Sequence, residues 1–382
     1  MDSCDLLIVG GGPAGSSCAW GLRSTGLDVV ILDRATFPRD KLCGGWITPL
    51  VLEALEIDPA GYVGSANGNA RILQPITGFR VSCLEQPDVA VHYGRTVSYG
   101  IRRCQFDDYL LKRSGARLRL GEALNRIERS KDGWIVNGEI KTRVLVGAGG
   151  HFCPVSRWMG NRDAVTPVLA QEIEFEMDSS QAAACTFAGE CPELFFCRDI
   201  RGYGWVFRKS HYLNIGLGRL DKHALSAHLH RFVQSLRQSG RLAFDPPANF
   251  AGHAYLLFGH SQRTLVADGV ILTGDAAGLA YPQSGEGIRT AVESGLIAAQ
   301  VVRAAAGDYR RQRLQPYVAK LRERFQQRPG RLEVLFRHLP RGLRDACARR
   351  LLRNAGFCRN VIVENWFLHT QDQRLPGIAT TP

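Results

Sequence analysis

The sequence predicts an α/β fold, and three observations carry that prediction. First, an apolar run at residues 6–9 leads directly into a glycine turn, GGGPAG, at residues 10–15. Second, another apolar run, at 29–32, ends in Asp33. Third, a buried-strand pattern returns far along the chain at 270–272, after a long stretch of different character. Together these features predict a Rossmann-like parallel sheet that is discontinuous in the sequence, with a second sheet inserted into it.

The first unit of this fold is predicted as strand, turn, helix and strand. In the turn, Gly10 permits a tight bend, Gly12 lets the backbone approach a pyrophosphate, and Gly15 allows close helix–strand packing. The helix, expected at about 13–24, presents free N–H groups and its positive dipole end to the phosphates. Asp33 is placed to accept hydrogen bonds from ribose hydroxyls. The sequence therefore predicts a dinucleotide site formed by Gly10, Gly12, Pro13, Ala14, Gly15, Asp33 and Arg34.

The segments that follow alternate between helix and strand patterns. A loop at 34–46 is rich in residues that break regular structure and has room to wrap a ligand. Alternation of apolar and polar residues at 70–98 predicts hairpin strands. The other elements expected in this part are helices at 48–55 and 106–114, strands at 118–129 and 134–137, and a buried strand at 144–150 that ends in glycines, Gly149 among them.

Residues 167–260 change character, with short strands separated by Gly, Asp and Pro and one strong helix at 226–238. This pattern predicts an inserted antiparallel sheet. The expected division is a discontinuous dinucleotide-binding domain (1–70, 99–165 and 262–306), an antiparallel substrate domain (71–98 and 166–261) and a helical, basic C-terminal region (307–382).

Composition narrows the class of protein. The chain has 382 residues, of which 45% are apolar and 22% charged, as in ordinary globular enzymes. No apolar run reaches the ~18 residues of a membrane span, and eleven cysteines without a CxxC pair predict a reduced, cytoplasmic protein. The net charge of +12 is compatible with an anionic membrane surface or an acidic partner. Nucleic acid is not expected as a partner, because no nucleic-acid module accompanies the basic residues, and no histidine spacing predicts a metal site.

Three separate segments point to FAD as the dinucleotide. Besides the glycine turn, Arg103 opens a helix after a strand, and Gly274-Asp275 places a carboxylate at a strand's carboxyl end, where ligands bind in open α/β sheets. That carboxylate can hold a ribityl hydroxyl. The run Gly285-Glu286-Gly287-Ile288 begins a helix whose N–H groups favour the negative charge that a reduced flavin carries near N1 and the C2 carbonyl.

These residues resemble the FAD-dependent aromatic hydroxylases, flavin halogenases and geranylgeranyl reductases, and two motifs resemble the geranylgeranyl reductase branch. The loop PRDKLCGG at 38–45 is similar to that branch's Pro-x-x-x-x-Cys-Gly-Gly, which implies that Cys43, Gly44 and Gly45 lie by the flavin. The segment YGWVFRK at 203–209 is similar to its Tyr-x-Trp-x-Phe-Pro-Lys strand, with Arg208 in place of the proline. The resemblance implies that Tyr203, Trp205, Phe207 and Lys209 line a prenyl pocket.

The resemblance implies an FAD-dependent reductase of carbon–carbon double bonds in a prenyl or similarly apolar substrate, with hydride delivered from flavin N5 and Cys43 as the candidate catalytic side chain. Two alternatives stay open: a flavin monooxygenase or halogenase of a specialised metabolite, and a non-catalytic flavin-binding protein. The electron donor is expected to be NAD(P)H or a reduced ferredoxin, the latter suited to a basic surface. The basic C-terminal helices, with Leu343, Cys347 and Leu351 at helical spacing, suggest peripheral contact with an anionic membrane.

Overall fold

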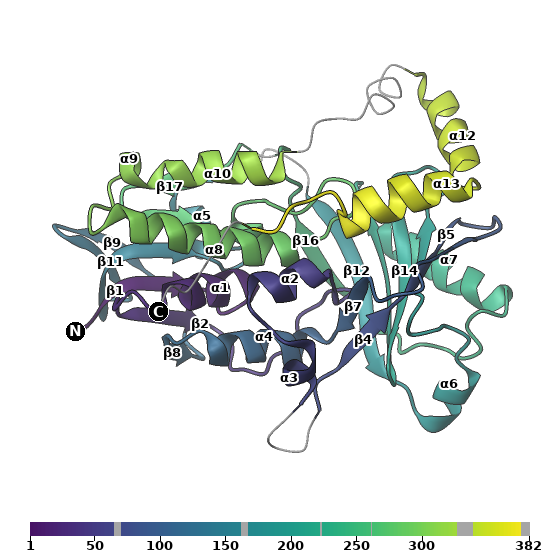
Figure 1. Ribbon diagram of the computed structural model, residues 1–382, viewed down its shortest axis with the longest axis horizontal. Coiled ribbons are helices and arrows are strands. Elements are labelled where there is room, and N and C mark those ends of the chain that lie inside the picture. The colour runs from purple at the N-terminus through teal and green to yellow at the C-terminus, as the bar shows by residue number, and fades with distance from the viewer. Residues whose placement is uncertain (65–69, 162–166, 222–223, 261, 327–338, 376–382) are drawn as a thin grey trace.

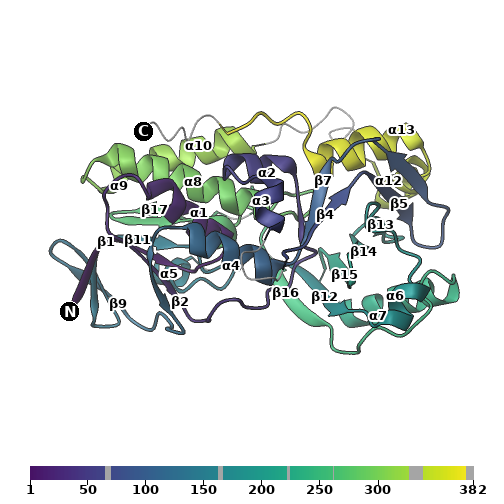
Figure 2. The ribbon, with the colours of Figure 1, turned by 60° about the horizontal axis from the view of Figure 1, so that its bottom comes forward.

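A computed structural model describes residues 1–64, 70–161, 167–221, 224–260, 262–326 and 339–375. Residues 65–69, 162–166, 222–223 and 261 of the expected domains, together with 327–338 and 376–382 of the expected tail, therefore lie outside the described residues. Two units stand side by side, a parallel sheet with its helices and a second, mostly antiparallel sheet (Figures 1 and 2).

The parallel sheet has β1 (Asp2–Val9) at its centre, between β2 (Val29–Asp33) and β11 (Ile140–Gly147). The rest of this sheet consists of β8 (Arg117–Leu120), β18 (Val270–Leu272), β17 (Val266–Ala267) and the hairpin β9 (Ile127–Ser130) and β10 (Gly133–Val136). Residues expected as one strand at 118–129 are thus divided between β8 and β9. The central strands are apolar and buried at 6–9, 29–32 and 144–146, where helices cover the sheet, whereas β1 and β11 begin with exposed polar residues such as Ser3 and Lys141.

The strand register gathers the predicted motifs at one edge. Val9 lies opposite both Leu32 and Gly147, and Gly147 lies opposite Leu272 in β18. The loops that follow β1, β2, β11 and β18 therefore leave the sheet at the same carboxyl edge, although they come from distant parts of the sequence. This edge is where open α/β sheets bind ligands.

Two helices begin at that edge and cross closely. An added Cβ on Gly295 of α8 (Ile288–Ala305) would lie 2.2 Å from the Ala14 carbonyl oxygen of α1 (Pro13–Leu22), so glycine is required for this approach. The contact holds the start of α1 against the middle of α8. The other helices of this unit are α2 (Pro49–Ala54), α3 (Pro59–Val63), α4 (Arg103–Arg113), α5 (Pro154–Trp158), a 3-10 turn at Gly274–Ala276, and α9 (Arg311–Leu314) and α10 (Pro316–Phe325) outside α8 (Figure 1).

The second sheet runs in the order β16 (Ala251–Tyr255), β12 (Val168–Glu176), β15 (Tyr212–Arg219), β14 (Gly202–Lys209), β13 (Glu193–Phe196), β5 (Gly78–Cys83) and β6 (Val89–His92). It is mixed rather than fully antiparallel, because β13 and β5 pair in parallel. Helices α6 (Ser179–Ala184) and α7 (Leu225–Gln238) lie on its outer side (Figure 2), and Phe232 of α7 packs over Gly204. The opposite face carries the aromatic side chains of β14.

A small third sheet joins the two units. It consists of β3 (Trp46–Ile47), β7 (Ser98–Ile101) and β4 (Leu73–Ile76), with β7 in the middle. The strand β4 was expected in the antiparallel domain with β5 and β6, but its hydrogen-bonding partner is β7. The hairpin pattern at 70–98 could not show which strand pairs with β4, because β5 and β6 lie within that segment and β7 begins at its end.

The C-terminal region divides between the two units instead of forming a layer of its own. While α9 and α10 cover α8, the helices α12 (Arg341–Leu351) and α13 (Ala355–Phe357) and the π-helix Cys358–Leu368 lie over the second sheet (Figure 1). Ile362, Val363 and Phe367 of the π-helix share a core with Trp205 and Phe207 of β14. The C-terminal π-helix therefore covers the aromatic face of β14. None of the described helices combines the length and apolarity that spanning a bilayer requires.

Candidate active site

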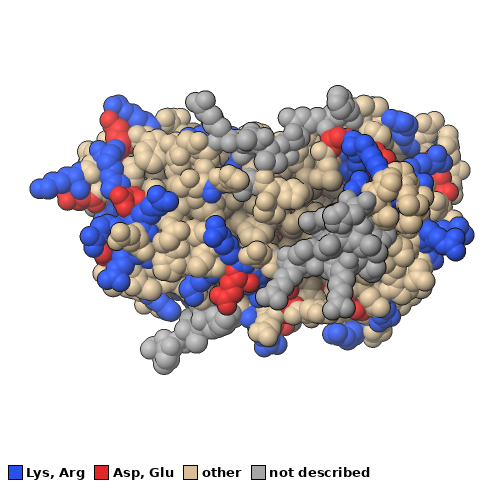
Figure 3. All heavy atoms as spheres, turned by 90° about the horizontal axis from the view of Figure 1, so that it is seen from above, with Lys and Arg blue, Asp and Glu red and all other residues tan. Residues whose placement is uncertain are grey.

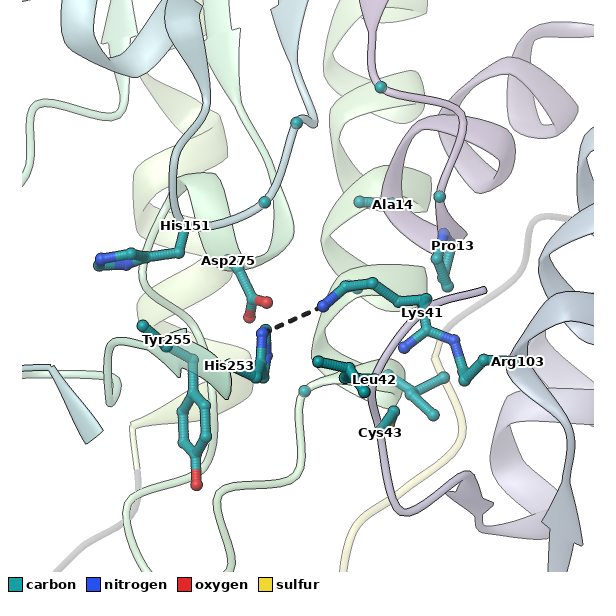
Figure 4. A pocket seen from close by; sticks show the side chains of 18 of the residues that line it. Pro13, Ala14, Lys41, Leu42, Cys43, Arg103, His151, His253, Tyr255 and Asp275 are labelled. Carbon is teal, nitrogen blue, oxygen red and sulfur yellow. Dashed lines mark hydrogen bonds between the residues drawn. The ribbon is translucent and has the colours of Figure 1, made fainter. Parts of the chain in front are cut away.

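A cavity of about 730 Å³ lies where the carboxyl edge of the parallel sheet meets the aromatic face of the second sheet. Its volume is typical of small-molecule and cofactor sites, which span roughly 300–1,000 Å³. Figure 4 shows side chains from α1, the loop after β2, α4 and β16 converging on it.

Nearly all residues that the sequence predicts as site residues line this one cavity. They are Gly10, Gly12, Pro13, Ala14, Asp33, Arg34, Cys43, Gly44, Gly45, Arg103, Gly149, Asp275, Gly285, Gly287, Ile288, Tyr203, Trp205 and Phe207. Gly15 and Gly274 lie behind the wall and shape it: an added Cβ on Gly15 would meet the Gly10 carbonyl oxygen at 1.9 Å. The convergence supports one extended ligand rather than several separate sites.

Lys209 does not line the cavity, which corrects the expectation that it contacts the substrate. It continues the face of Tyr203, Trp205 and Phe207 along β14, but its side chain is only 1% exposed and forms an ion pair with Glu174 at 2.5 Å. An added Cβ on Gly45 would collide with the Lys209 ammonium. Lys209 therefore packs against the Cys43–Gly45 loop on the side away from the cavity.

The end of the cavity next to the parallel sheet fits a dinucleotide. Helix α1 has no side-chain cap, so N–H groups of its first turn are free to bind an anion. The Asp33 carboxylate accepts hydrogen bonds from the backbone N–H groups of Gly11 (2.7 Å) and Ala35 (2.9 Å), which fixes it beside the turn. At the start of α8, on the opposite side of the cavity, the Glu286 carboxylate accepts a hydrogen bond from the backbone N–H of Arg289 at 2.6 Å, so a side chain already caps part of this helix start. The uncapped start of α1 and a fixed carboxylate match the donors and the acceptor that the adenosine half of an FAD molecule requires.

Cationic side chains lie between these two helix starts. Arg103 makes a bidentate ion pair with buried Asp107, both bonds at 2.8 Å, and Arg39 lies 3.4 Å from the same carboxylate. Burial lowers the pKa of Arg103, but Asp107 and the Cys43 thiol outweigh burial and raise it above its ordinary value. Arg103 is therefore a fixed positive charge next to Cys43, in a position to neutralise a phosphate or a reduced ring.

A second polar group faces the cavity from the opposite wall. The Lys41 ammonium bonds to His253 Nδ1 at 3.1 Å, and Asp275 lies close by (Figure 4). Burial lowers the pKa of His253 to about 3, so the ring is neutral and Nδ1 accepts from Lys41. Burial and the charge of Arg103 also lower the pKa of Lys41. Neither Lys41 nor His253 was singled out from the sequence, because a lone histidine on a strand carries no spacing signal.

The aromatic wall and the Cys43 loop hold each other in place. The indole N–H of Trp205 donates to Asn214 Oδ1 at 2.7 Å, and the Asn214 amide donates to the Cys43 carbonyl at 3.3 Å. Gly44 packs on the Phe207 ring, where an added Cβ would lie 3.1 Å from a ring carbon. The two motifs that resemble one family are therefore adjacent in space, and they form one side of the cavity together.

Two buried carboxyl groups of the cavity were missed by the sequence analysis. They are Glu172 on β12 and Glu286 before α8, and burial raises the pKa of each to about 7. A signal for Glu172 exists in the sequence: it shares the period-two face of Val168 and Ala170, where an acid is unusual. Glu286 gives no such signal, since it lies in a loop.

Asp275→Asn is expected to weaken FAD binding about 10- to 100-fold. The carboxylate is partly exposed to the cavity, and a hydrogen bond to a charged group contributes about 1.5–3 kcal/mol. Burial raises the pKa of Asp275, so the isosteric amide is not expected to destabilise the cofactor-free protein. Titration of the apoprotein with FAD, followed by flavin fluorescence, measures the change. Asp308→Asn, at a carboxylate outside the cavity, is the control, and equal affinity in both variants would contradict the assignment.

The chain resembles known proteins in both sequence and fold. Residues 8–51 match a family model described as an NAD(P)-binding Rossmann-like domain. Digeranylgeranylglycerophospholipid reductase 1 of Methanothermobacter thermautotrophicus is 30% identical over 345 residues, which cover 84% of this chain and 82% of the relative.

Solved structures share the fold. A geranylgeranyl bacteriochlorophyll reductase-like protein from Thermoplasma acidophilum superposes with a TM-score of 0.74 at 22% identity, covering 92% of this chain and 91% of the other. A halogenase in complex with FAD superposes with a TM-score of 0.66 at 19% identity, covering 85% of this chain and 74% of the other.

Proposed function

Because this chain belongs to the geranylgeranyl reductase family of FAD-dependent oxidoreductases, we propose that it reduces carbon–carbon double bonds in a geranylgeranyl-type or similarly apolar isoprenoid. The observation that carries the proposal is the junction of two different surfaces in one cavity: the uncapped start of α1 with Asp33 and Asp275 at one end, and the aromatic wall at the other. The first surface suits a dinucleotide, and the second suits a hydrocarbon chain.

The residues of the chain divide the work accordingly. The α1 turn and Asp33 hold the adenosine half of FAD, while Asp275 and the start of α8 hold the ribityl chain and ring. FAD held there would supply, in its reduced form, the hydride for reduction of the alkene. Tyr203, Trp205 and Phe207 exclude water and align the isoprenoid, since Tyr203 is held by a hydrogen bond from its hydroxyl to the Ser284 carbonyl and Trp205 by Asn214.

The test is an anaerobic single turnover. Purified protein is reduced without oxygen and mixed with a geranylgeranyl lipid, and flavin reoxidation is followed together with product mass. The proposal expects reoxidation with a gain of two hydrogens per reduced double bond. Reoxidation that needs O2 and incorporates oxygen or halogen would instead establish the monooxygenase or halogenase alternative. Absence of any substrate-dependent reoxidation would favour a non-catalytic flavoprotein.

Cys43→Ala is expected to slow turnover about tenfold, equivalent to about 1.4 kcal/mol of transition-state stabilisation, with FAD content unchanged. We propose Cys43 as a catalytic residue that contacts cofactor and substrate, because it lines the cavity between Arg103 and the aromatic wall. Stopped-flow flavin reoxidation measures the effect. Cys104→Ala, at a thiol that does not line the cavity, is the control, and unchanged turnover in the Cys43 variant would rule out a catalytic role.

The electron donor is proposed to be NAD(P)H or a reduced ferredoxin. The net charge of +12 favours encounter with an acidic protein. On the face shown in Figure 3, however, acidic side chains accompany many of the basic ones. Rates of flavin reduction by NADH, NADPH and reduced ferredoxin, measured at low and high salt, decide between the donors, since only a protein donor is expected to be strongly salt-dependent.

Helix α12 is the proposed contact with a membrane. None of its residues is buried, it exposes Leu343, and arginines surround that side chain. A basic helix with exposed apolar residues suits an anionic lipid surface, where a lipid substrate would reside. Flotation with anionic vesicles at low salt is expected to recover the protein, and Leu343→Asp to reduce that recovery. Failure of the unaltered protein to float would remove the proposal.

A further inference from the structure

Glu172 occupies an unusual place in the cavity wall. Strand register puts Trp205, Gly216, Glu172 and Ala251 in one row across four strands, all on the face toward the cavity. An added Cβ on Gly216 would lie 2.3 Å from the Trp205 ring and 2.7 Å from Glu172 Cβ. The indole therefore lies across the glycine, directly beside the carboxyl-bearing side chain. Glu172 thus belongs to the wall that aligns the substrate.

The carboxyl group of Glu172 is buried without a hydrogen-bonding partner at one oxygen. The residue is 2% exposed, and Oε2 has no hydrogen-bond partner among the residues that the structure describes. Its neighbour on the same face, Glu174, is in contrast paired with both Lys209 and Arg102. A buried carboxyl group without an ion pair is most stable in its neutral, proton-carrying form. The cavity wall therefore presents an O–H group next to the expected position of the hydrocarbon chain.

We propose that Glu172 is the proton donor for double-bond reduction, an inference that rests on the proposed function and names a catalytic group for it. One alkene carbon receives hydride, which brings both electrons of the new C–H bond, from a two-electron flavin reductant. The other carbon uses the π electron pair to bond the proton of Glu172, whose O–H bond breaks. The alkene is reduced by two electrons, the reductant is oxidised by two, and Glu172 is left as a carboxylate that regains a proton from water before the next turnover.

The charges around Glu172 set the pH at which it can act. Burial raises its pKa to about 7, and Glu174 adds to this, while Lys209, Lys41 and Arg103 lower the pKa. The Tyr255 hydroxyl on β16 also faces it and stays neutral, because burial raises the pKa of that phenol. Below pH 7 the acid is protonated and able to donate; above pH 7 its protonated fraction falls tenfold per pH unit.

The experiment compares Glu172→Gln, Glu172→Asp and the control Glu176→Gln. Glu176 lies on the same strand but is exposed and bonds to Tyr212. With a geranylgeranyl lipid and prereduced protein, Glu172→Gln is expected to lower turnover about 100-fold at pH 6 and to lose the decline above pH 7. FAD content and KM are expected to be unchanged. Glu172→Asp should recover part of the rate with the pH dependence restored, and Glu176→Gln should match the unaltered protein.

A second measurement does not depend on activity. In cofactor-free protein, the infrared carboxyl C=O band that disappears in Glu172→Gln is expected to titrate near pH 7. Because the folded protein holds this proton more tightly than the unfolded chain, stability is lost as pH rises from about 4.5 to 7. The melting temperature of Glu172→Gln, relative to that of the unaltered protein, is therefore expected to rise as the pH increases over that interval.

The two proposals fail in different ways. If the unaltered protein reduces the alkene and Glu172→Gln reduces it equally fast with the same pH profile, the role of Glu172 is overturned while the proposed function stands. If the unaltered protein reduces no alkene, the proposed function fails. A Glu172 carboxyl band that titrates near its ordinary value would overturn the inference on its own.

Discussion

Gly10→Ala is expected to lower the free energy of unfolding by about 3 kcal/mol and to yield protein without bound flavin. Gly10 has φ +115°, a region that L side chains adopt at a cost of about 1–2 kcal/mol. An added Cβ would also lie 2.4 Å from the Ala148 carbonyl oxygen, and relief of such overpacking costs about 1–3 kcal/mol more. The backbone shift that relieves the clash would displace the dinucleotide turn itself, because Ala148 belongs to the loop after β11.

Gly26→Ala is the matched control for this prediction. Gly26 also has a left-handed φ of +74°, but nothing lies within 4 Å of an added Cβ. This variant is therefore expected to lose only about 1 kcal/mol and to keep its flavin. Urea unfolding and the flavin absorbance of purified protein measure both quantities. Equal losses in the two variants would show that the contact with Ala148 contributes nothing.

Arg289→Ala is expected to destabilise the protein by about 3–5 kcal/mol. Arg289, fully buried in the first turn of α8, pairs with Glu293 at 2.9 Å and with Asp372 of the C-terminal segment at 3.0 Å. Arg324 of α10 donates to both Glu293 oxygens, at 2.7 and 2.8 Å. Loss of Arg289 leaves Glu293, only 1% exposed, with a single cation in a dry environment. The C-terminal segment would also lose its anchor to α8.

Two further variants distinguish the stability effect of this buried ion-pair network from that of an exposed ion pair. Arg310→Ala, at an arginine that is 77% exposed and pairs with Asp308, is expected to cost at most about 1 kcal/mol. The double variant Arg289→Met with Glu293→Leu is expected to restore only part of the stability: it removes the buried carboxylate, but Arg324 and Asp372 then lose their partners. Thermal unfolding of the three variants tests the prediction, and a loss for Arg289→Ala no larger than that for Arg310→Ala would refute it.

The cofactor end of the site was predictable because local rules govern it. A turn that approaches a pyrophosphate needs glycine at fixed positions, and carboxyl ends of parallel strands meet at one edge of a sheet. Gly10, Asp33 and Asp275 could therefore be assigned from their sequence context alone, and all three line the cavity. The fold class and the insertion of the second sheet followed from hydrophobic periodicity in the same way.

Predictions that required a partner from elsewhere in the chain were less accurate. Period-two alternation correctly put Lys209 on the face of Trp205, but only the ion pair with Glu174, two strands away on β12, explains why it is buried outside the cavity. The parallel pairing of β13 with β5 and the pairing of β4 with β7 also bring together strands that are distant in the sequence, so the local pattern of each strand does not specify its partner. Nothing in the tail sequence specified that its π-helix covers the aromatic strand.

By itself, the sequence determined the nucleotide unit, its cofactor class and the family of the chain, since each of these depends on short motifs whose backbone requirements are strict. Only the tertiary structure decided which polar groups meet inside the cavity. Glu172, Lys41 and His253 come from three distant segments, and their protonation states arise from burial and mutual charge. Those are properties of the assembled site, because desolvation and Coulomb interaction act between side chains that are adjacent only after folding.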